Sequence, residues 1–153
     1  MIYPSLREFI KQLELNNELV RIKERVSPIL EIAEITDRVS KQPRGGRALI
    51  FENVEGSTMP VLINAFGSTT RINSALGVHD IEKIPKDIDK YLKITPPSSL
   101  LEKVKLLPML LEAASFPPKI VSSKQAPCQE VILTGNDVDL EKIPIIQCWP
   151  NDA

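Results

Sequence analysis

Two apolar runs, Ala48-Leu49-Ile50-Phe51-Glu52 and Pro60-Val61-Leu62-Ile63-Asn64-Ala65, decide the fold of this chain. Both runs are rich in the β-branched and large apolar residues that favour strands. The connector between them, residues 53–59, is polar and contains Gly56. We therefore expect two strands that form either a hairpin or a neighbouring pair joined by a wider loop.

The residues before these runs predict a helix, a strand and a second helix. Ser5 and Glu8 have the spacing of a capping box, which opens a helix. Residues 18–24 then predict a strand. Ser27-Pro28 predicts the N-cap and first position of a second helix that ends near Gln42-Pro43. The buried stripe of this helix is predicted to comprise Ile29, Ile32, Ala33, Thr36 and Val39.

Three further helices are predicted after the two runs. A short helix over residues 71–76 ends at Gly77. Helical spacing continues over residues 80–94, with an interruption expected at Pro85. An apolar helix follows from about residue 100 to residue 111, with a capping box at Ser99 and Glu102 and a kink expected at Pro108.

The pattern changes near residue 120, where helical spacing gives way to short apolar runs. Residues 128–134 and 145–149 predict strands, separated by a turn at residues 135–137. We place a domain boundary at about residue 120. The expected fold class is α/β (α+β), with an α/β domain over residues 1–120 and the start of a β domain over residues 121–153.

The composition excludes some classes of protein. The chain has 153 residues, 19 of them Lys or Arg and 20 Asp or Glu, so its net charge is −1. A protein built to hold nucleic acid or an anionic membrane needs a basic surplus, which this chain lacks. The apolar runs fall short of the ~20 residues that span a bilayer. Cys128 and Cys148 form no CxxC pair, and we expect reduced, buried thiols in a cytoplasmic protein.

Few residues suggest catalysis. His79 is the single histidine, beside Asp80, and we expect it to be solvated or to cap a helix. A structural zinc site needs about four Cys or His ligands in a recognisable pattern, which the sequence does not supply. The carboxylates Asp137, Asp139 and Glu141 cluster at a turn, and turn chemistry explains them better than acid–base catalysis.

Two short segments could face an anion. In Gly67-Ser68-Thr69-Thr70-Arg71, the free N–H groups of a helix start would act together with Ser68, Thr69 and Arg71. Ser and Thr are also common N-caps, so we favour a structural role. The flexible loop Arg44-Gly45-Gly46-Arg47 could face an anion or be solvated. Trp149 is expected to be a core or interface aromatic.

Several stretches, in order and over nearly the whole chain, resemble the UbiD family of decarboxylases. The less specific pieces are residues 5–9, 18–22, 31–39, 71, 75–77, 126–131 and 137–140. The most specific are Leu49-Ile50-Phe51-Glu52-Asn53-Val54-Glu55-Gly56, Met59-Pro60-Val61-Leu62-Ile63-Asn64-Ala65-Phe66-Gly67-Ser68 and Ile143-Pro144-Ile145-Ile146-Gln147-Cys148-Trp149-Pro150-Asn151-Asp152-Ala153.

The resemblance implies a longer chain of which this is about the first third. It implies an N-terminal α/β domain, a split β-barrel flavin-binding domain that begins here, and a C-terminal domain that serves assembly into a homo-oligomer. The family cofactor is prenylated FMN with a divalent metal, Mn or Mg, held by Asn, His and Glu residues. All of these positions would lie beyond Ala153, so the resemblance assigns no catalytic, cofactor or metal residue here.

The family reaction is the reversible non-oxidative decarboxylation of aromatic or α,β-unsaturated acids. Some members act on a polyprenyl-hydroxybenzoate in ubiquinone synthesis. By this resemblance the chain belongs to a carboxy-lyase and is inactive alone, with the rest of the same polypeptide as its partner. Two alternatives stay open: a stand-alone binding or assembly module, and a small flavin-binding subunit.

Overall fold

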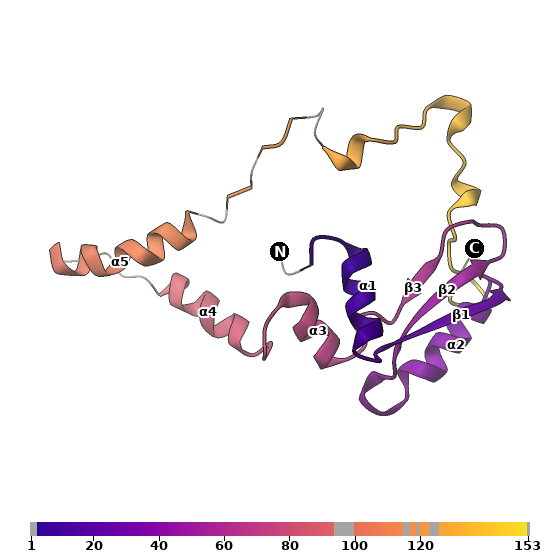
Figure 1. The fold of residues 1–153 in the computed structure, drawn as a ribbon, viewed down its shortest axis with the longest axis horizontal. Helices are drawn as coiled ribbons and strands as arrows, with labels where there is room; N and C mark the ends of the chain where they lie inside the picture. The colour runs from indigo at the N-terminus through magenta and orange to yellow at the C-terminus, as the bar shows by residue number, and fades with distance from the viewer. Residues whose placement is uncertain (1–2, 94–99, 115–116, 119, 123–125, 153) are drawn as a thin grey trace. The chain divides into compact units, whose positions relative to one another are not determined.

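The computed structural model describes residues 3–93, 100–114, 117–118, 120–122 and 126–152 (Figure 1). The chain divides into two compact units. Unit 1 comprises residues 1–86 and 139–153, and unit 2 comprises residues 87–138.

A mixed sheet of three strands forms the centre of unit 1. Strands β1 (Leu19–Val26), β2 (Ala48–Val54) and β3 (Val61–Ile63) lie in the order β1-β2-β3. Strand β1 runs parallel to β2, and β3 runs antiparallel to it. The two decisive runs therefore pair as antiparallel neighbours, and the expected α+β class is confirmed.

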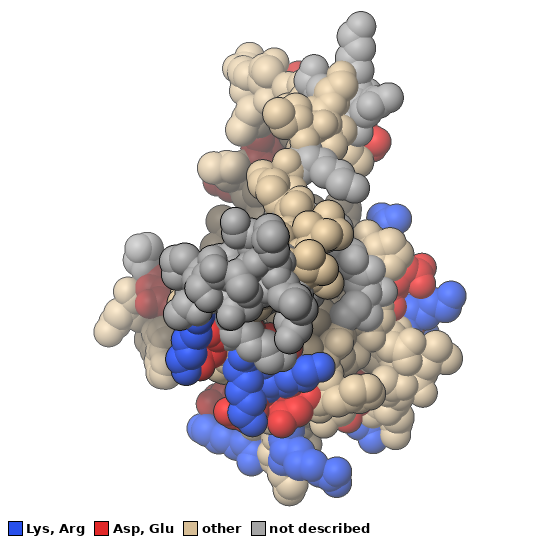
Figure 2. Space-filling model, turned by 90° about the vertical axis from the view of Figure 1, so that its left-hand side faces the viewer, with Lys and Arg blue, Asp and Glu red and all other residues tan. Residues whose placement is uncertain are grey.

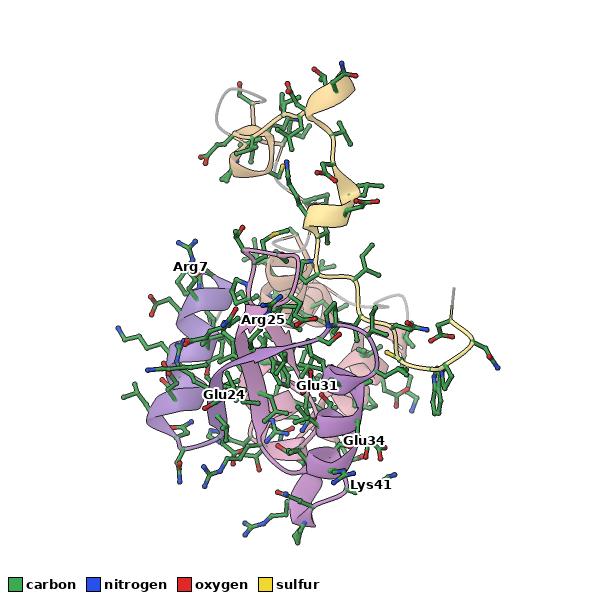
Figure 3. The ribbon with its side chains drawn as sticks, turned by 90° about the vertical axis from the view of Figure 1, so that its right-hand side faces the viewer. Arg7, Glu24, Arg25, Glu31, Glu34 and Lys41 are labelled. Atoms are coloured by element: carbon green, nitrogen blue, oxygen red, sulfur yellow. The ribbon has the colours of Figure 1, made fainter. Side chains whose placement is uncertain are left out.

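The central strand β2 is buried on both faces because its side chains alternate between two cores. Leu49 and Phe51 point into one core together with Ile32 of helix α2 (Glu31–Ser40). Ala48 and Ile50 point into the other core with Phe9 and Leu13 of helix α1 (Leu6–Leu15). Figure 3 shows α1 and α2 on opposite sides of the strands. This arrangement explains why the run is continuously apolar.

Helix α1 begins as the sequence predicts. The Ser5 hydroxyl accepts a hydrogen bond from the Glu8 N–H at 3.3 Å, which satisfies one of the free donors of the first turn. Phe9 and Leu13 carry the buried side of the helix. The helix ends at Asn16, and Asn17 follows with φ 57°, a left-handed conformation that asparagine tolerates.

Helix α2 begins three residues later than predicted, so Ser27 is not its N-cap and Pro28 is not its first residue. The backbone here is held by the tail of the chain instead. Gln147 N–H donates to the Pro28 carbonyl, and Leu30 N–H donates to the Gln147 carbonyl, both at 3.0 Å. Leu30 takes φ 63°, and Ile29 is 61% exposed, so Ile29 does not belong to the buried stripe.

The next two helices lie near their predicted positions but differ in their bounds. Helix α3 (Thr69–Leu76) has Ser68 as N-cap, and Gly77 ends it in the left-handed conformation. Helix α4 (Lys83–Leu92) contains Pro85 without interruption. Pro85 lies in the first turn of α4, where a missing N–H breaks no intrahelical hydrogen bond, and the expected interruption is therefore wrong.

Unit 2 contains the apolar helix α5 (Leu100–Ala113), which continues through Pro108. The capping residue predicted at Ser99 lies outside the described residues. Short 3₁₀ turns follow at η3 (Pro127–Gln129), η4 (Gly135–Asp137) and, in unit 1, η5 (Leu140–Lys142). None of the described helices is long and apolar enough to cross a membrane.

The strands predicted at residues 128–134 and 145–149 do not form. A strand needs a neighbour for its backbone N–H and C=O groups, and residues 131–134 have none among the described residues. Val131 and Ile132 are accordingly 78% and 73% exposed. In the second run, a single parallel bridge between Ile29 and Gln147 is formed.

The thiols and the tryptophan are also placed differently from the sequence prediction. Cys128 and Cys148 are free, as expected, but exposed rather than buried. Trp149 is 70% exposed, so it is not a core aromatic of this chain. The side chain that anchors the tail is instead Ile146, which packs against the core beneath α2.

An ion-pair network ties α1 to the sheet. The Arg21 guanidinium donates to Glu14 on α1 and to Glu52 on β2. The hydrogen bond from Arg21 lowers the pKa of the Glu14 carboxyl from its usual value of 4.5. Because the pKa of Glu14 is lower in the folded protein, its pairing with Arg21 stabilises the fold at pH values above the unfolded pKa. This stabilisation is lost as the pH falls through the folded pKa.

We expect Arg21→Gln to raise the pKa of Glu14 back toward 4.5. The pair is exposed, so the effect on stability is small and the carboxyl titration is the sensitive readout. The measurement is an NMR pH titration of the Glu14 side-chain carboxyl. The matched control is Arg7→Gln on the same helix, since Figure 3 shows Arg7 at the outer surface of α1. An unchanged Glu14 titration in Arg21→Gln would contradict the assignment.

Candidate functional site

The loop at residues 43–47 is clamped onto the turn at residues 64–67. The Asn64 side-chain amide donates to the carbonyls of Gly45 and Arg47, both at 2.8 Å. A Cβ atom at Gly45 would lie 1.8 Å from the Gly67 carbonyl oxygen, and one at Gly67 would lie 1.8 Å from Asn64 Oδ1. The two segments therefore touch at distances that only glycine permits.

Arg71 joins this clamp to the sheet from inside the protein. Its side chain is 1% exposed, and its Nη1 donates to Glu18 Oε2 at 2.6 Å and to the Gly46 carbonyl at 2.8 Å. Its Nε and Nη2 atoms are buried without a hydrogen-bond partner in the described structure. Arg71 thus links the start of β1, the clamped loop and α3, and it keeps unused donor capacity.

We expect Arg71→Leu to lower the free energy of unfolding by about 2 kcal/mol, because Glu18 and the Gly46 carbonyl lose their buried donor. Urea unfolding followed by circular dichroism measures this change. Glu18→Gln in the same background should recover part of the loss, since it removes the unpaired carboxylate. A variant as stable as the parent would show that the cost of burying the unpartnered Nε and Nη2 offsets everything that Nη1 contributes.

A hollow of about 240 Å³ opens where the clamped loop meets the start of α3. Its walls include two residues that Arg71 holds, Glu18 and Gly46. Arg44 and Arg47 line it from the loop, and Ser68 and Thr70 line it from α3. The two segments that the sequence singles out separately as possible anion-binding elements therefore face one space.

The predicted site residues take different parts at this hollow. Ser68 lines it, but its hydroxyl also accepts the Arg71 N–H at 3.2 Å as the N-cap of α3. Arg71 lies behind the wall, and Thr69 does not line the hollow, whereas Thr70 does. Asn64, which holds the loop, carried no signal in the sequence. The loop expected to be flexible is fixed by this residue.

Two other candidate residues, His79 and Asp139, make structural contacts. The His79 carbonyl accepts from the Asn73 amide at 3.0 Å. Asp139 accepts from the Glu141 N–H at 3.0 Å and pairs with Lys142, which is a local turn arrangement. Among the residues that the structure describes, no three His, Cys, Asp or Glu side chains come together as metal ligands would.

A second, apolar groove of about 580 Å³ lies between α2 and the tail. Leu30 and Ala33 of α2, Ile63 of β3 and Trp149 of the tail provide apolar lining. Glu34 and Lys41, at the polar edge of the groove, are labelled on α2 in Figure 3, with the tail running beside this helix. The groove has an apolar floor and no cluster of convergent donors, so it suits packing better than chemistry.

The face shown in Figure 2 gives no sign of a single dominant charge. On the face in Figure 2, Lys and Arg side chains lie among Asp and Glu side chains. Such mixing keeps long-range fields weak. Recognition by this chain is therefore expected to depend on local features such as the hollow.

Comparison with known proteins identifies the family. Residues 10–91 match the model of the 3-octaprenyl-4-hydroxybenzoate carboxy-lyase N-terminal domain, UbiD_N. Residues 119–153 match the Rift-related domain of the same carboxy-lyase. The chain belongs to the UbiD family. An uncharacterized protein of Aquifex aeolicus (strain VF5) is 49% identical over 151 residues, which is 99% of this chain and 30% of that protein.

Solved UbiD-class enzymes share the fold. The vanillic acid decarboxylase of Sedimentibacter hydroxybenzoicus in its open form matches with a TM-score of 0.70 at 23% identity, over 98% of this chain and 29% of that one. An evolved dimeric form of the UbiD-class enzyme HmfF from Pelotomaculum thermopropionicum, in complex with prFMN, matches with a TM-score of 0.61 at 27% identity. That match covers 95% of this chain and 28% of HmfF. The UbiD chain described here thus spans less than a third of the length of these relatives.

Proposed function

We propose that this chain is the N-terminal part of a prenylated-FMN-dependent decarboxylase that removes CO₂ from an aromatic or α,β-unsaturated acid. The observation that carries the proposal is the ordered match to two UbiD domains within one chain. The relative in complex with prFMN supports the cofactor, and the vanillic acid decarboxylase supports the reaction class. A polyprenyl-hydroxybenzoate of ubiquinone synthesis is one candidate substrate.

In this proposal the chemistry lies in residues beyond Ala153. When bound, the modified flavin supplies an electron sink for the charge left by CO₂. By the family resemblance, the residues that would hold Mn or Mg also lie beyond Ala153, so we assign no step to the described residues. Their proposed part is to form the α/β domain against which the cofactor domain folds.

The proposed division of the chain is an α/β domain to about residue 120 and the first part of the split-barrel domain after it. The start of the second family match at residue 119 supports this boundary. In the same proposal, the apolar residues 131–133 become strand residues once neighbouring strands are present. The longer protein would be a cytoplasmic homo-oligomer, and the dimeric HmfF form supports the assembly.

Reconstitution tests the proposal. The 153-residue chain and a version continued along its natural reading frame are each incubated with prenylated FMN and Mn²⁺, and then with a panel of aromatic and unsaturated acids. We expect that only the longer protein shows flavin absorbance after desalting and releases CO₂. Turnover by the 153-residue chain would overturn our placement of the chemistry. A longer protein that binds no flavin would overturn the proposed function.

A stand-alone binding or assembly module is the second candidate, favoured by the two-sided core of unit 1 and the apolar groove beside α2. A stop codon directly after Ala153 would support it. A yellow 153-residue protein after FMN soaking would instead favour a small flavin-binding subunit.

A further inference from the structure

A loop with two positively charged side chains and the start of helix α3 meet at the 240 Å³ hollow of unit 1. Arg44 and Arg47 reach it from the loop between α2 and β2, and Thr70 reaches it from α3. Within the described ranges, neither of these two arginines forms an ion pair with a carboxylate. The clamp by Asn64 holds their backbone against the α3 start, so the convergence is built into the fold.

The start of α3 adds donors to the same space. Ser68 Oγ accepts the Arg71 N–H, while the N–H groups of Thr69 and Thr70 have no acceptor among the described residues. Free N–H groups of a helix start carry partial positive charge and favour an anion. The Thr70 hydroxyl, from the same turn, can donate as well.

Arg71 adds positive charge close to the hollow. Its guanidinium reaches the wall of the hollow, where Nη1 bonds to Glu18 and Gly46. A guanidinium has five N–H donors, and the three on Nε and Nη2 are buried without an acceptor. Arg71 is not among the residues that line the hollow, so these donors add positive charge behind its wall without facing its space.

The charges around the hollow favour an anion even though Glu18 lines it. Arg44, Arg47 and Arg71 contribute three positive charges and Glu18 one negative charge, which leaves a sum of +2. The Glu18 carboxylate is already paired with Arg71 at 2.6 Å. An incoming anion therefore meets two unpaired guanidinium groups rather than a free carboxylate.

We propose that this hollow binds an oxyanion, the phosphate or carboxylate group of a small ligand, between Arg44, Arg47 and the start of α3. The volume is below the ~300–1,000 Å³ of sites that enclose a whole drug-sized molecule, and it suits a charged group alone. Guanidinium groups pair with both oxyanions in bidentate fashion. This site is independent of the decarboxylase proposal, since it uses residues of this chain alone.

Titration of the ¹⁵N-labelled 153-residue chain tests the site. Inorganic phosphate and, separately, acetate are added at constant ionic strength while amide shifts are recorded. We expect saturable shifts at Gly46, Thr69 and Thr70. Arg44→Gln/Arg47→Gln should weaken the affinity on the order of a hundredfold, since two charged hydrogen bonds are lost and each is worth about tenfold. Thr70→Val, which keeps the β-branched shape, should weaken it less.

The matched control is Arg7→Gln/Lys11→Gln, which removes two positive charges from exposed positions of α1. It should leave the affinity within about twofold, because distant surface charges are screened. Tighter binding of phosphate than of acetate would assign a phosphate ligand, and tighter binding of acetate would assign a carboxylate. Absence of saturable shifts, or equal weakening in both double variants, would overturn the proposal.

Discussion

Replacing Gly45 by alanine should lower the free energy of unfolding by at least ~3 kcal/mol. The added Cβ would meet the Gly67 carbonyl oxygen at 1.8 Å, and this oxygen is backbone that cannot rotate away. The residue also has φ 81°, which disfavours any side chain. Relief requires the loop to leave the turn, and both Asn64 hydrogen bonds would then break. Urea unfolding of the full 153-residue chain measures the loss.

Gly56→Ala is the matched control for this prediction. Gly56 has a similar φ of 76°, but a Cβ there would have nothing within 4 Å. Its substitution therefore reports the backbone strain alone, about 1 kcal/mol. Equal losses in the two variants would contradict the close approach of the loop to the turn, and with it the geometry of the hollow.

Phe51→Ala should lower the free energy of unfolding by about 3–5 kcal/mol. Phe51 lies on β2, the strand covered on both faces, and its side chain is fully buried. It belongs to the core cluster that includes Ile32 of α2 and Val61 of β3. Removing the ring leaves a cavity that the paired backbone of β1 and β3 cannot close. Hydrogen exchange of the β2 amides would show the same loss locally.

Phe66→Ala is the comparison for the core prediction. Phe66 is 60% exposed and stacks on Phe9 with ring centroids 5.9 Å apart. Truncating it should cost about 1 kcal/mol, the worth of one aromatic contact. If Phe66→Ala were as harmful as Phe51→Ala, the assignment of β2 as the doubly covered centre would be wrong.

Local patterns in the sequence predicted most of unit 1. The capping box at Ser5, the continuous run at residues 48–51 and the glycine stop at Gly77 depend on near neighbours, so spacing reveals them. The start of α2 could not be predicted this way. It depends on Gln147, which bonds to the backbone at Pro28 and Leu30 from far along the chain. The prediction of strands at residues 128–134 and 145–149 was wrong for the same reason. A strand depends on partner strands that the spacing of apolar residues does not specify.

The candidate site was foreseen in part. The sequence indicated Arg44, Arg47 and Ser68 as residues able to meet an anion, because charge and helix-start chemistry are local properties. It could not show that the two segments converge, since that requires the Asn64 clamp. Nor could it show that Arg71 turns inward to Glu18, because burial of an arginine is decided by tertiary packing.

The mass of the protein that the natural gene produces tests the central claim most directly. The chain described here has a mass of 17.1 kDa and spans 30% of the length of its Aquifex relative. If it is the first part of a carboxy-lyase, mass spectrometry of the protein purified from its source will give roughly three times that value, because the chain covers 30% of the relative's length. A protein of 17.1 kDa purified from the source would contradict the account.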